Sequence, residues 1–377
     1  MKEGYKQTEI GVIPEDWEVS SLDCEYSLYA GGDLDDSDYS PVKTQEYRFP
    51  IYSNGMQQNG IYGFCACPQF SENAVTITGR GDIGHSSFRD EPFSAIIRLL
   101  VCQPKHPISS RFIAEYLEMT KPFVFESTGV PQLTVPQIKN TPLPIPPLAE
   151  QNRIAEALSD MDELIASLEK LIEKKKAIKQ GAMQELLTGK RRLPGFCGLW
   201  KPVELRQLGR FVGGGTPSTN KPDWWKGNIP WISSSDLEVN QIKNIKMSRF
   251  ITQEAVIQSA TCLCPEGTVL VVSRVGVGKV AVAPIALCTS QDFTNIIVEK
   301  CNSYFLAYVL SAIMKEKAAT TQGTSIKGIT SDEIAAITIN IPTMKEQEEI
   351  SIILCNFDRD IELIENKLLK AQQTSKA

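Results

Sequence analysis

Cysteine, histidine and acidic residues are the types that most often hold metals or perform acid–base chemistry. Two Cys-x-Cys pairs, Cys65–Cys67 and Cys262–Cys264, lack the Cys-x-x-Cys spacing of zinc sites, and the histidines are only His85 and His106. The sequence shows neither a Ser-His-Asp set nor a repeated cluster of two acids and a lysine. We therefore expect no metal and no catalytic set on this chain.

Two glycine-rich stretches have residue types that could bind a cofactor. Phe211–Gly215, FVGGG, resembles the loop that holds S-adenosylmethionine in methyltransferases, but no strand-then-helix pattern surrounds it. Gly276–Lys279, GVGK, has part of a phosphate-loop pattern, but Ser273 replaces the first glycine and Val280 replaces the Ser or Thr that would bind magnesium. We therefore expect a tight turn at each stretch.

Loops rich in Asn, Gln, Arg, Ser and Thr carry side chains suited to DNA, because Arg binds guanine, Asn and Gln bind adenine, and Ser, Thr and Lys bind phosphates. In the first half the candidates are Asn54, Gln57, Gln58, Asn59, Arg80, His85 and Arg89. In the second half they are Thr216, Ser218, Asn220, Lys221, Ser234, Ser235, Arg274, Lys279, Thr324 and Lys327. Each residue taken alone could be a turn former, so the prediction depends on their joint placement.

These loops belong to two copies of one pattern. Trp17 and Gly31 recur as Trp200 and Gly214 at an offset of 183 residues, and Thr76–Gly84 resembles Leu270–Gly278. The offset increases to 196 near the end of each copy, so the copies differ in loop length but keep their order. Each half is therefore predicted to be one globular domain followed by one long helix.

The two long helices are predicted from apolar residues that recur at steps of four and three, which is the pattern of a heptad seam. Each helix begins after a proline, at a Glu-Gln pair. We expect the helices to pack on each other as an antiparallel coiled coil, although burial on separate cores would give a similar pattern. The predicted helix–helix and subunit interface residues are Glu150, Gln151, Ile154, Leu158, Met161, Ile165, Leu168, Ile172, Glu346, Gln347, Ile350, Leu354, Phe357, Ile361, Ile364 and Leu368.

Within each domain, short β-branched and aromatic runs cut by Gly, Pro, Asn and Ser predict strands with connecting loops. The clearest buried strands are AVTIT and TVLVVS. Helical spacing appears over 111–120 and 303–320, followed by short helix starts at 135–138 and 331–334. We predict an α+β class with mixed or mostly antiparallel sheets and pseudo-two-fold symmetry. The predicted domains span 1–148 and 192–343, and the helical parts span 149–191 and 344–377.

The composition of the 377 residues is that of an ordinary water-soluble protein, with room for two cores. No segment approaches the roughly 20 apolar residues of a membrane span, and the ten cysteines without an export signal favour reduced thiols in the cytoplasm. The net charge of −6 argues mildly against general affinity for nucleic acid, but only a local basic face is needed.

Over essentially its whole length the sequence resembles the specificity subunit of type I restriction-modification systems. The motifs that carry the resemblance are the Ile-Pro-x-x-Trp start ending at Trp17, the segments Arg80–Gly84 and Arg274–Gly278, LLTGKRRLP, and the two helix starts PPLAEQNRIA and PTMKEQEEIS. The complete set, present in order in both halves, is more specific than any single motif.

The resemblance implies two target recognition domains, each binding one half of an asymmetric bipartite site in double-stranded DNA. It also implies that the helices act as a spacer and dock two modification subunits, which restriction subunits can join. S-adenosylmethionine, ATP and Mg would then belong to the partners, with no cofactor on this chain. The alternatives are a self-contained DNA methyltransferase or nuclease, and a protein-only scaffold.

Overall fold

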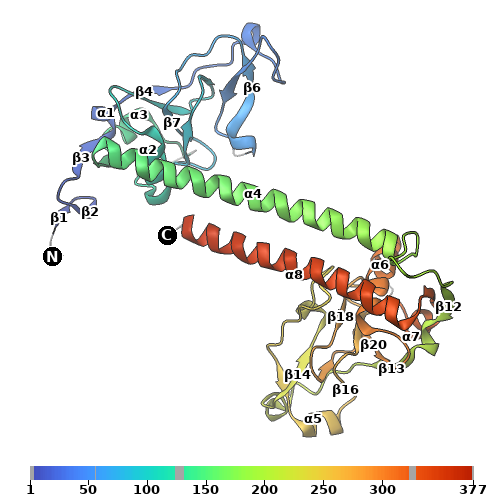
Figure 1. Ribbon diagram of the computed structural model, residues 1–377. Helices are drawn as coiled ribbons and strands as arrows, with labels where there is room; N and C mark the ends of the chain where they lie inside the picture. The colour runs from blue at the N-terminus through green and yellow to red at the C-terminus, as the bar shows by residue number, and fades with distance from the viewer. Residues whose placement is uncertain (1–3, 56, 124–130, 322–327, 376–377) are drawn as a thin grey trace. The chain divides into compact units, whose positions relative to one another are not determined.

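The computed structural model describes residues 4–55, 57–123, 131–321 and 328–375, and its contacts divide the chain into two compact units (Figure 1). Unit 1 is Met1–Leu164 and unit 2 is Ile165–Ala377. The boundary falls inside helix α4 (Leu148–Leu186), so each unit contains one domain and a part of this helix.

Unit 1 is built on a four-stranded antiparallel sheet with the order β4-β10-β7-β8. A smaller sheet has the order β6-β5-β9, in which β5 and β9 are parallel. The strands are β1 (Tyr5–Thr8), β2 (Gly11–Pro14), β3 (Glu18–Ser21), β4 (Tyr26–Ala30), β5 (Phe49–Tyr52), β6 (Ile61–Cys65), β7 (Ala74–Ile77), β8 (Ser86–Arg89), β9 (Ser94–Ala95), β10 (Leu100–Pro104) and β11 (Pro142–Ile145). The short helices are α1 (Leu22–Glu25), α2 (Ser110–Thr120) and α3 (Val135–Ile138).

Unit 2 repeats this plan with a four-stranded antiparallel sheet of order β13-β20-β17-β18 and a second sheet of order β15-β14-β19-β16. Its strands are β12 (Lys201–Glu204), β13 (Gly209–Gly213), β14 (Ile229–Ile232), β15 (Phe250–Ile251), β16 (Leu263–Cys264), β17 (Val269–Val272), β18 (Val280–Val282), β19 (Leu287–Thr289), β20 (Phe293–Val298) and β21 (Thr338–Ile341). Its helices are α5 (Gln253–Gln258), α6 (Ser303–Thr321), α7 (Ser331–Ala335) and α8 (Met344–Ser375).

The duplication predicted from the sequence is confirmed in both the order and the pairing of the elements. In each unit the central sheet carries one helix, α2 on β7 and β8 and α6 on β17 and β18. The strands AVTI of β7 and VLVV of β17 are completely buried, as expected for continuous apolar runs at the centre of a domain. The α+β class with mostly antiparallel sheets is therefore also confirmed.

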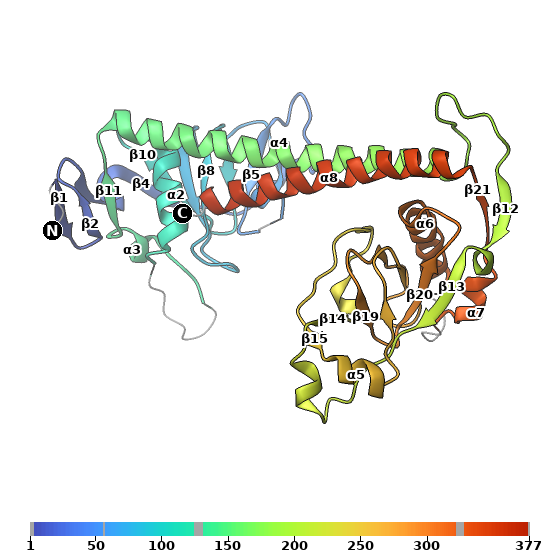
Figure 2. The same ribbon diagram turned by 60° about the horizontal axis from the view of Figure 1, so that its bottom comes forward.

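In unit 2 the C-terminal part of α4 lies antiparallel to α8 (Figure 2). Lys176 Nζ is 2.7 Å from Glu365 Oε1, whereas Lys179, about one turn further along α4, pairs with Asp358, two turns back along α8. Ile172 and Ile361 are buried. The predicted antiparallel coiled coil is confirmed for this part of the helices.

Over its remaining length the predicted seam also contacts the domain cores. Ile350 and Leu354 are buried in a cluster that joins the core of the second domain to Leu186 of α4, and Ile154 packs against the core of unit 1. The other predicted seam residues are half-buried, namely Leu158, Met161, Ile165, Leu168, Phe357, Ile364 and Leu368. A helix packed on a core has the same three-and-four spacing as a coiled coil, so the pattern alone could not separate the two.

The Glu-Gln pairs at the helix starts also bind their own units. Trp17 Nε1 donates to Glu150 Oε2 at 3.1 Å, and Arg192 donates two bonds to Glu346, at 2.7 and 2.8 Å. Gln151 and Gln347 are buried and bond within their own units. Their assignment to an interface between helices or subunits is corrected, because these side chains attach each long helix to the domain before it.

Among the described residues, no helix is long and apolar enough to cross a membrane. Within the same residues, no group of three or more Cys, His, Asp or Glu side chains is arranged to hold a metal ion.

Candidate nucleic-acid interface

Each unit has a hollow at the same place. It lies where the loop after β7 or β17 meets the segment before α3 or α7. Hollow 1, of about 210 Å³, is lined by Ala30, Gly79, Arg80, Arg98, Leu100, Gln132, Leu133, Thr134, Val135 and Pro136. Hollow 2, of about 670 Å³, is lined by Gly213, Gly214, Ser273, Arg274, Val275, Gln291, Asp292, Phe293, Thr294, Gly328, Ile329, Thr330 and Ser331. Arg80 and Arg274, which the sequence aligns with each other, therefore lie in equivalent hollows.

The same backbone contact builds both hollows. Leu133 N donates to Gly79 O at 2.8 Å, and Ile329 N donates to Ser273 O at 2.7 Å. The next residue in each case is a threonine that forms a capping box, Thr134 at the start of α3 and Thr330 at the start of α7. The repeated motif therefore specifies a rigid wall on which the arginine is placed.

Arg80 is exposed, and its Nη2 is 3.4 Å from Gln132 Oε1 across hollow 1. Arg98, which sequence reasoning missed, lines the same hollow, is exposed and has a left-handed backbone with φ +58°. In hollow 2 Arg274 is also exposed. Exposed guanidinium groups on a fixed backbone can bind phosphates or guanine edges.

Asn54 fixes the wall of hollow 1. Its Oδ1 accepts from Gly79 N at 2.7 Å and from Arg80 N at 3.3 Å, and its Nδ2 donates to Ile97 O at 2.6 Å. The predicted adenine contact of Asn54 is thus replaced by a structural role, because three backbone groups occupy its amide.

Arg89 is buried at 4% exposure, which contradicts its predicted role as a DNA contact. Its Nε donates to Thr76 Oγ1 at 2.9 Å, its Nη1 donates to Asn59 O at 3.2 Å, and its guanidinium lies 3.6 Å from the centre of the Tyr52 ring. Arg89 therefore supports the loop that carries the exposed residues Gln57 and Asn59. The side chain of Gln58 lies outside the described residues.

His85 lies beside a carboxylate. Its Nδ1 is 3.1 Å from Glu118 Oε2, and its Nε2 is 3.2 Å from Ser87 Oγ. Burial pushes the pKa of Glu118 upward, but hydrogen bonds from the Ser86 N–H and from His85 outweigh this and hold the pKa below its ordinary value. His85 is half-exposed, so a ligand could reach its ring but would compete with Glu118 for the imidazole.

In unit 2, Lys279 and the serines 234 and 235 are brought together. Lys279 Nζ donates to Ser234 O at 2.8 Å, and Ser235 Oγ is 2.8 Å from Ser233 Oγ. Arg249, which sequence reasoning missed, donates to Ser233 Oγ at 2.7 Å and also pairs with Asp236. These contacts form a polar surface at the end of β14, in the position that corresponds to the Asn54 loop.

The 216–221 loop packs on tryptophans. Lys221 Nζ lies 3.9 Å from the centre of the Trp224 ring, and Ser218 O accepts from Trp225 Nε1 at 3.3 Å. Thr216 donates to Gln291, which lines hollow 2. Asn220 is exposed. The predicted candidates Thr324 and Lys327 lie outside the described residues.

Close packing of backbones requires the last two glycines of FVGGG, Gly214 and Gly215. A Cβ on Gly214 would lie 2.0 Å from Ser290 O, and a Cβ on its counterpart Gly31 would lie 2.7 Å from the Ala95 carbonyl carbon. The stretch is the end of β13 and the crossing that follows it. The tight connection expected from the sequence is therefore present at Gly214 and Gly215.

A family model of the type I restriction modification DNA specificity domain matches the chain twice, over residues 14–180 and 198–373. The chain belongs to this family. The two matches coincide with the two domains and the helices that follow them. The common domain therefore includes the arginine-bearing hollow and the start of the long helix.

Similar curated proteins are named as type I specificity subunits. The type I restriction enzyme MjaIX specificity subunit of Methanocaldococcus jannaschii is 35% identical over 45% of this chain and 39% of its own length. The putative MjaX specificity subunit of the same organism is 24% identical over 100% of this chain and 94% of its own length. The EcoR124I/EcoR124II specificity subunit of Escherichia coli is 30% identical over 58% of this chain and 56% of its own length.

Solved structures share the fold. The type I S subunit from M. genitalium matches with a TM-score of 0.65 and 14% identity, covering 95% of this chain and 94% of that one. The HsdS subunit from Thermoanaerobacter tengcongensis matches with a TM-score of 0.51 and 15% identity, covering 97% and 95%. At these identities the likeness extends to the fold alone.

Proposed function

We propose that this chain is the DNA sequence-recognition subunit of a type I restriction-modification complex, and that each unit binds one part of an asymmetric bipartite target. The observation that carries the proposal is the arginine-bearing hollow, which occurs twice on equivalent walls with different side chains around it. A repeated frame with divergent polar loops suits the recognition of two different sequences. Membership of the specificity family supports the same function.

The two hollows differ in the chemistry that they offer to base edges. Hollow 1 combines Arg80 with Arg98 and Gln132, whereas hollow 2 combines Arg274 with Gln291 and Asp292. Arginine binds guanine or phosphate, Gln suits adenine, and a carboxylate accepts from the amino group of cytosine. The two half-sites should therefore differ in sequence, and phosphate contacts should make the affinity dependent on salt.

The long helices are proposed to set the distance between the half-sites and to dock two modification subunits, with restriction subunits joining the assembly. Leu171 and Ile178, seven residues apart on α4, and Ile352, Leu363 and Leu369 on α8 are between 39% and 53% exposed. Large apolar side chains exposed on the long helices suit a protein partner better than water.

In this proposal the chain binds DNA and its partners perform the chemistry. Methyl transfer from S-adenosylmethionine would belong to the modification subunits, and ATP and Mg would be used by the restriction subunits. The complex would act in the cytoplasm, where the DNA is. The packing role of Gly214 and Gly215 supports this division, because it gives two glycines of the FVGGG stretch a structural reason.

The test is methylation of a random DNA library with and without modification subunits. The assembled complex should methylate adenine within one bipartite motif, and the chain alone should neither methylate DNA nor bind S-adenosylmethionine in calorimetry. Methylation by the chain alone, abolished in Gly213→Asp, would instead support a self-contained methyltransferase. A complex that enriches no motif would support a protein-only scaffold.

A further inference from the structure

Lys179 occupies a position in the helix seam where an apolar residue is expected. Ile172, Lys179 and Leu186 follow one another at steps of seven on α4, and they are 7%, 8% and 6% exposed. No other α4 residue between Ile172 and Leu186 is buried. A single polar residue at such a position can specify the register of two helices, because a shifted register leaves it without partners.

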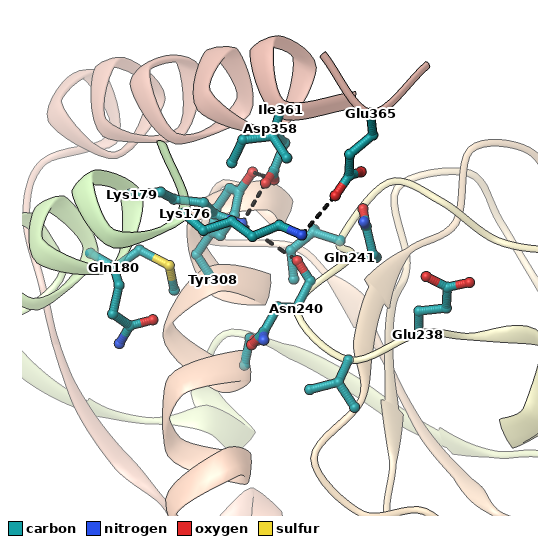
Figure 3. Close-up of a pocket in the computed structure, with 14 residues that line it drawn as sticks. Lys176, Lys179, Gln180, Glu238, Asn240, Gln241, Tyr308, Asp358, Ile361 and Glu365 are labelled. Atoms are coloured by element: carbon teal, nitrogen blue, oxygen red, sulfur yellow. Dashed lines mark hydrogen bonds and ion pairs between the residues drawn. The ribbon is translucent and has the colours of Figure 1, made fainter. Parts of the chain in front are cut away.

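The partners of Lys179 come from three other segments of unit 2 (Figure 3). Its ammonium group pairs with one carboxylate oxygen of Asp358 on α8, and the other oxygen accepts from the Tyr308 hydroxyl on α6. Lys179 Nζ is also 3.4 Å from the backbone oxygen of Asn240, in the loop that precedes β15. One lysine therefore joins α4 to α8, to α6 and to the body of the second domain.

This network borders a hollow of about 350 Å³ between α4, α8, α6 and the 238–242 loop. The charged side chains that the helices bring to the hollow form two pairs, Lys179 with Asp358 and Lys176 with Glu365, and the exposed Glu238 lines it from the loop. Burial, together with the Asp358 carboxylate, raises the pKa of Tyr308 well above its ordinary value, so its hydroxyl keeps the proton that it donates. The two ion pairs and the Tyr308 hydroxyl therefore serve the contact between the elements.

In unit 1 the aspartate that corresponds to Asp358 is not buried. Asp162 stands at the position of Asp358 and pairs with Arg111 on α2, but its side chain is 57% exposed. The side chain of Asp358 is 13% exposed. An exposed pair constrains geometry weakly because water competes for both groups, whereas a buried pair permits few arrangements.

We infer that the Lys179–Asp358 pair fixes the register of α4 against α8, and through it the separation of the two half-sites that the complex accepts. This inference rests on the proposed function. Lys179 is a positioning residue, since it contacts neither of the arginine-bearing hollows. Replacing both charges by apolar residues of similar size can leave a fold intact while loosening the constraint on its geometry.

The experiment uses the complete chain, assembled with modification subunits, and DNA duplexes whose half-sites are separated by the native spacer or by one base pair more or less. The variant is Lys179→Met combined with Asp358→Leu. We expect the preference for the native spacer to fall by about tenfold, because the wild-type assembly can accept a wrong spacer only by distorting protein or DNA. Both half-site sequences should stay unchanged.

The matched control is Lys175→Met with Asp360→Leu, which removes a more exposed pair on the same two helices, joined at 3.0 Å, with Lys175 one turn from Lys179 and Asp360 two residues from Asp358. This control should keep the wild-type preference. A folded Lys179→Met/Asp358→Leu variant that prefers the native spacer as strongly as wild type would overturn the inference.

If the double variant fails to fold, Tyr308→Phe removes one bond to Asp358 and keeps the aromatic ring. A smaller loss of preference is then expected, and an unchanged preference would again overturn the inference. A wild-type complex without any bipartite preference would contradict the proposed function itself, which separates that failure from the failure of the register inference.

Discussion

Gln151 and Gln347 make the same pair of hydrogen bonds, each inside its own unit. Gln151 Oε1 accepts from Ser109 N at 2.9 Å, and its Nε2 donates to Pro146 O at 2.9 Å. Gln347 Oε1 accepts from Asn302 N at 2.8 Å, and its Nε2 donates to Pro342 O at 3.0 Å. Each glutamine thus joins the start of a long helix to the start of α2 or α6, which explains why the Glu-Gln motif occurs twice.

Removing this bridge should destabilise the unit that contains it. Gln347→Ala leaves a backbone N–H and a carbonyl without partners at a buried site, which should lower the free energy of unfolding of unit 2 by about 2–4 kcal/mol. Gln373→Ala, an exposed position on the same helix, should change it by less than about 0.5 kcal/mol. Denaturant unfolding of the two variants measures the difference, and equal effects would show that the bridge has no special role.

Glu118 should make the stability of unit 1 depend on pH. Its folded-state pKa lies below the ordinary value of 4.5, so its contribution is fully present above that value and is lost as the pH falls through the lower folded-state pKa. Glu118→Gln should therefore be less stable than wild type near pH 7, and the difference should shrink on acidification. Denaturant unfolding of both proteins near pH 7 and at a pH below the folded-state pKa of Glu118 tests this. A difference in the free energy of unfolding that does not change with pH would contradict it.

The arginines that line the two hollows, Arg80 and Arg274, should act on separate half-sites. Arg80→Ala should relax or weaken recognition of one half of the target, and Arg274→Ala should affect the other half, each by about 1–3 kcal/mol of binding. Arg210→Ala is the control, because Arg210 is exposed near the opposite end of β13 and pairs with Glu299 at 3.0 Å. Binding of the assembled complex to duplexes with single changed bases provides the measurement. Loss of the same half-site in both variants would refute the assignment.

Shortening the first long helix should shorten the target. Deleting seven residues between Leu158 and Lys174 removes about 10 Å of helix at 1.5 Å per residue, which corresponds to about three base pairs of DNA. We expect methylated motifs with a shorter spacer and the same half-sites. Changed half-site sequences would mean that the helix does not set the spacing.

Much of the fold could be predicted because the sequence contains an internal repeat, so each element is indicated by two copies of its pattern. The buried strands β7 and β17, the helices α2 and α6, and the short helices α3 and α7 all occur where apolar runs, helical spacing and capping residues predicted them. The alignment of Arg80 with Arg274 also placed these two residues correctly in equivalent positions. Local signals and repetition together were sufficient for these features.

The missed features depend on contacts between distant segments. Arg89 is buried because Thr76, Asn59 and Tyr52 together satisfy its guanidinium, and no local pattern predicts that set. Arg98 lies at hollow 1 because Ile97 and Arg98 both have left-handed backbones. Without a glycine at either position, the sequence does not indicate this turn. Lys179 was left out of the seam because a search for apolar periodicity rejects a charged residue, although its step of seven from Ile172 was visible in the sequence.

The most direct test of sequence recognition is adenine-methylation mapping of the genome of a cell that carries this gene, compared with the same cell after the gene is deleted. We expect one asymmetric bipartite motif, with two specified parts separated by a fixed number of unspecified bases, whose methylation disappears on deletion. A single continuous motif, or a methylation pattern that deletion does not change, would contradict the assignment of this chain as the recognition subunit.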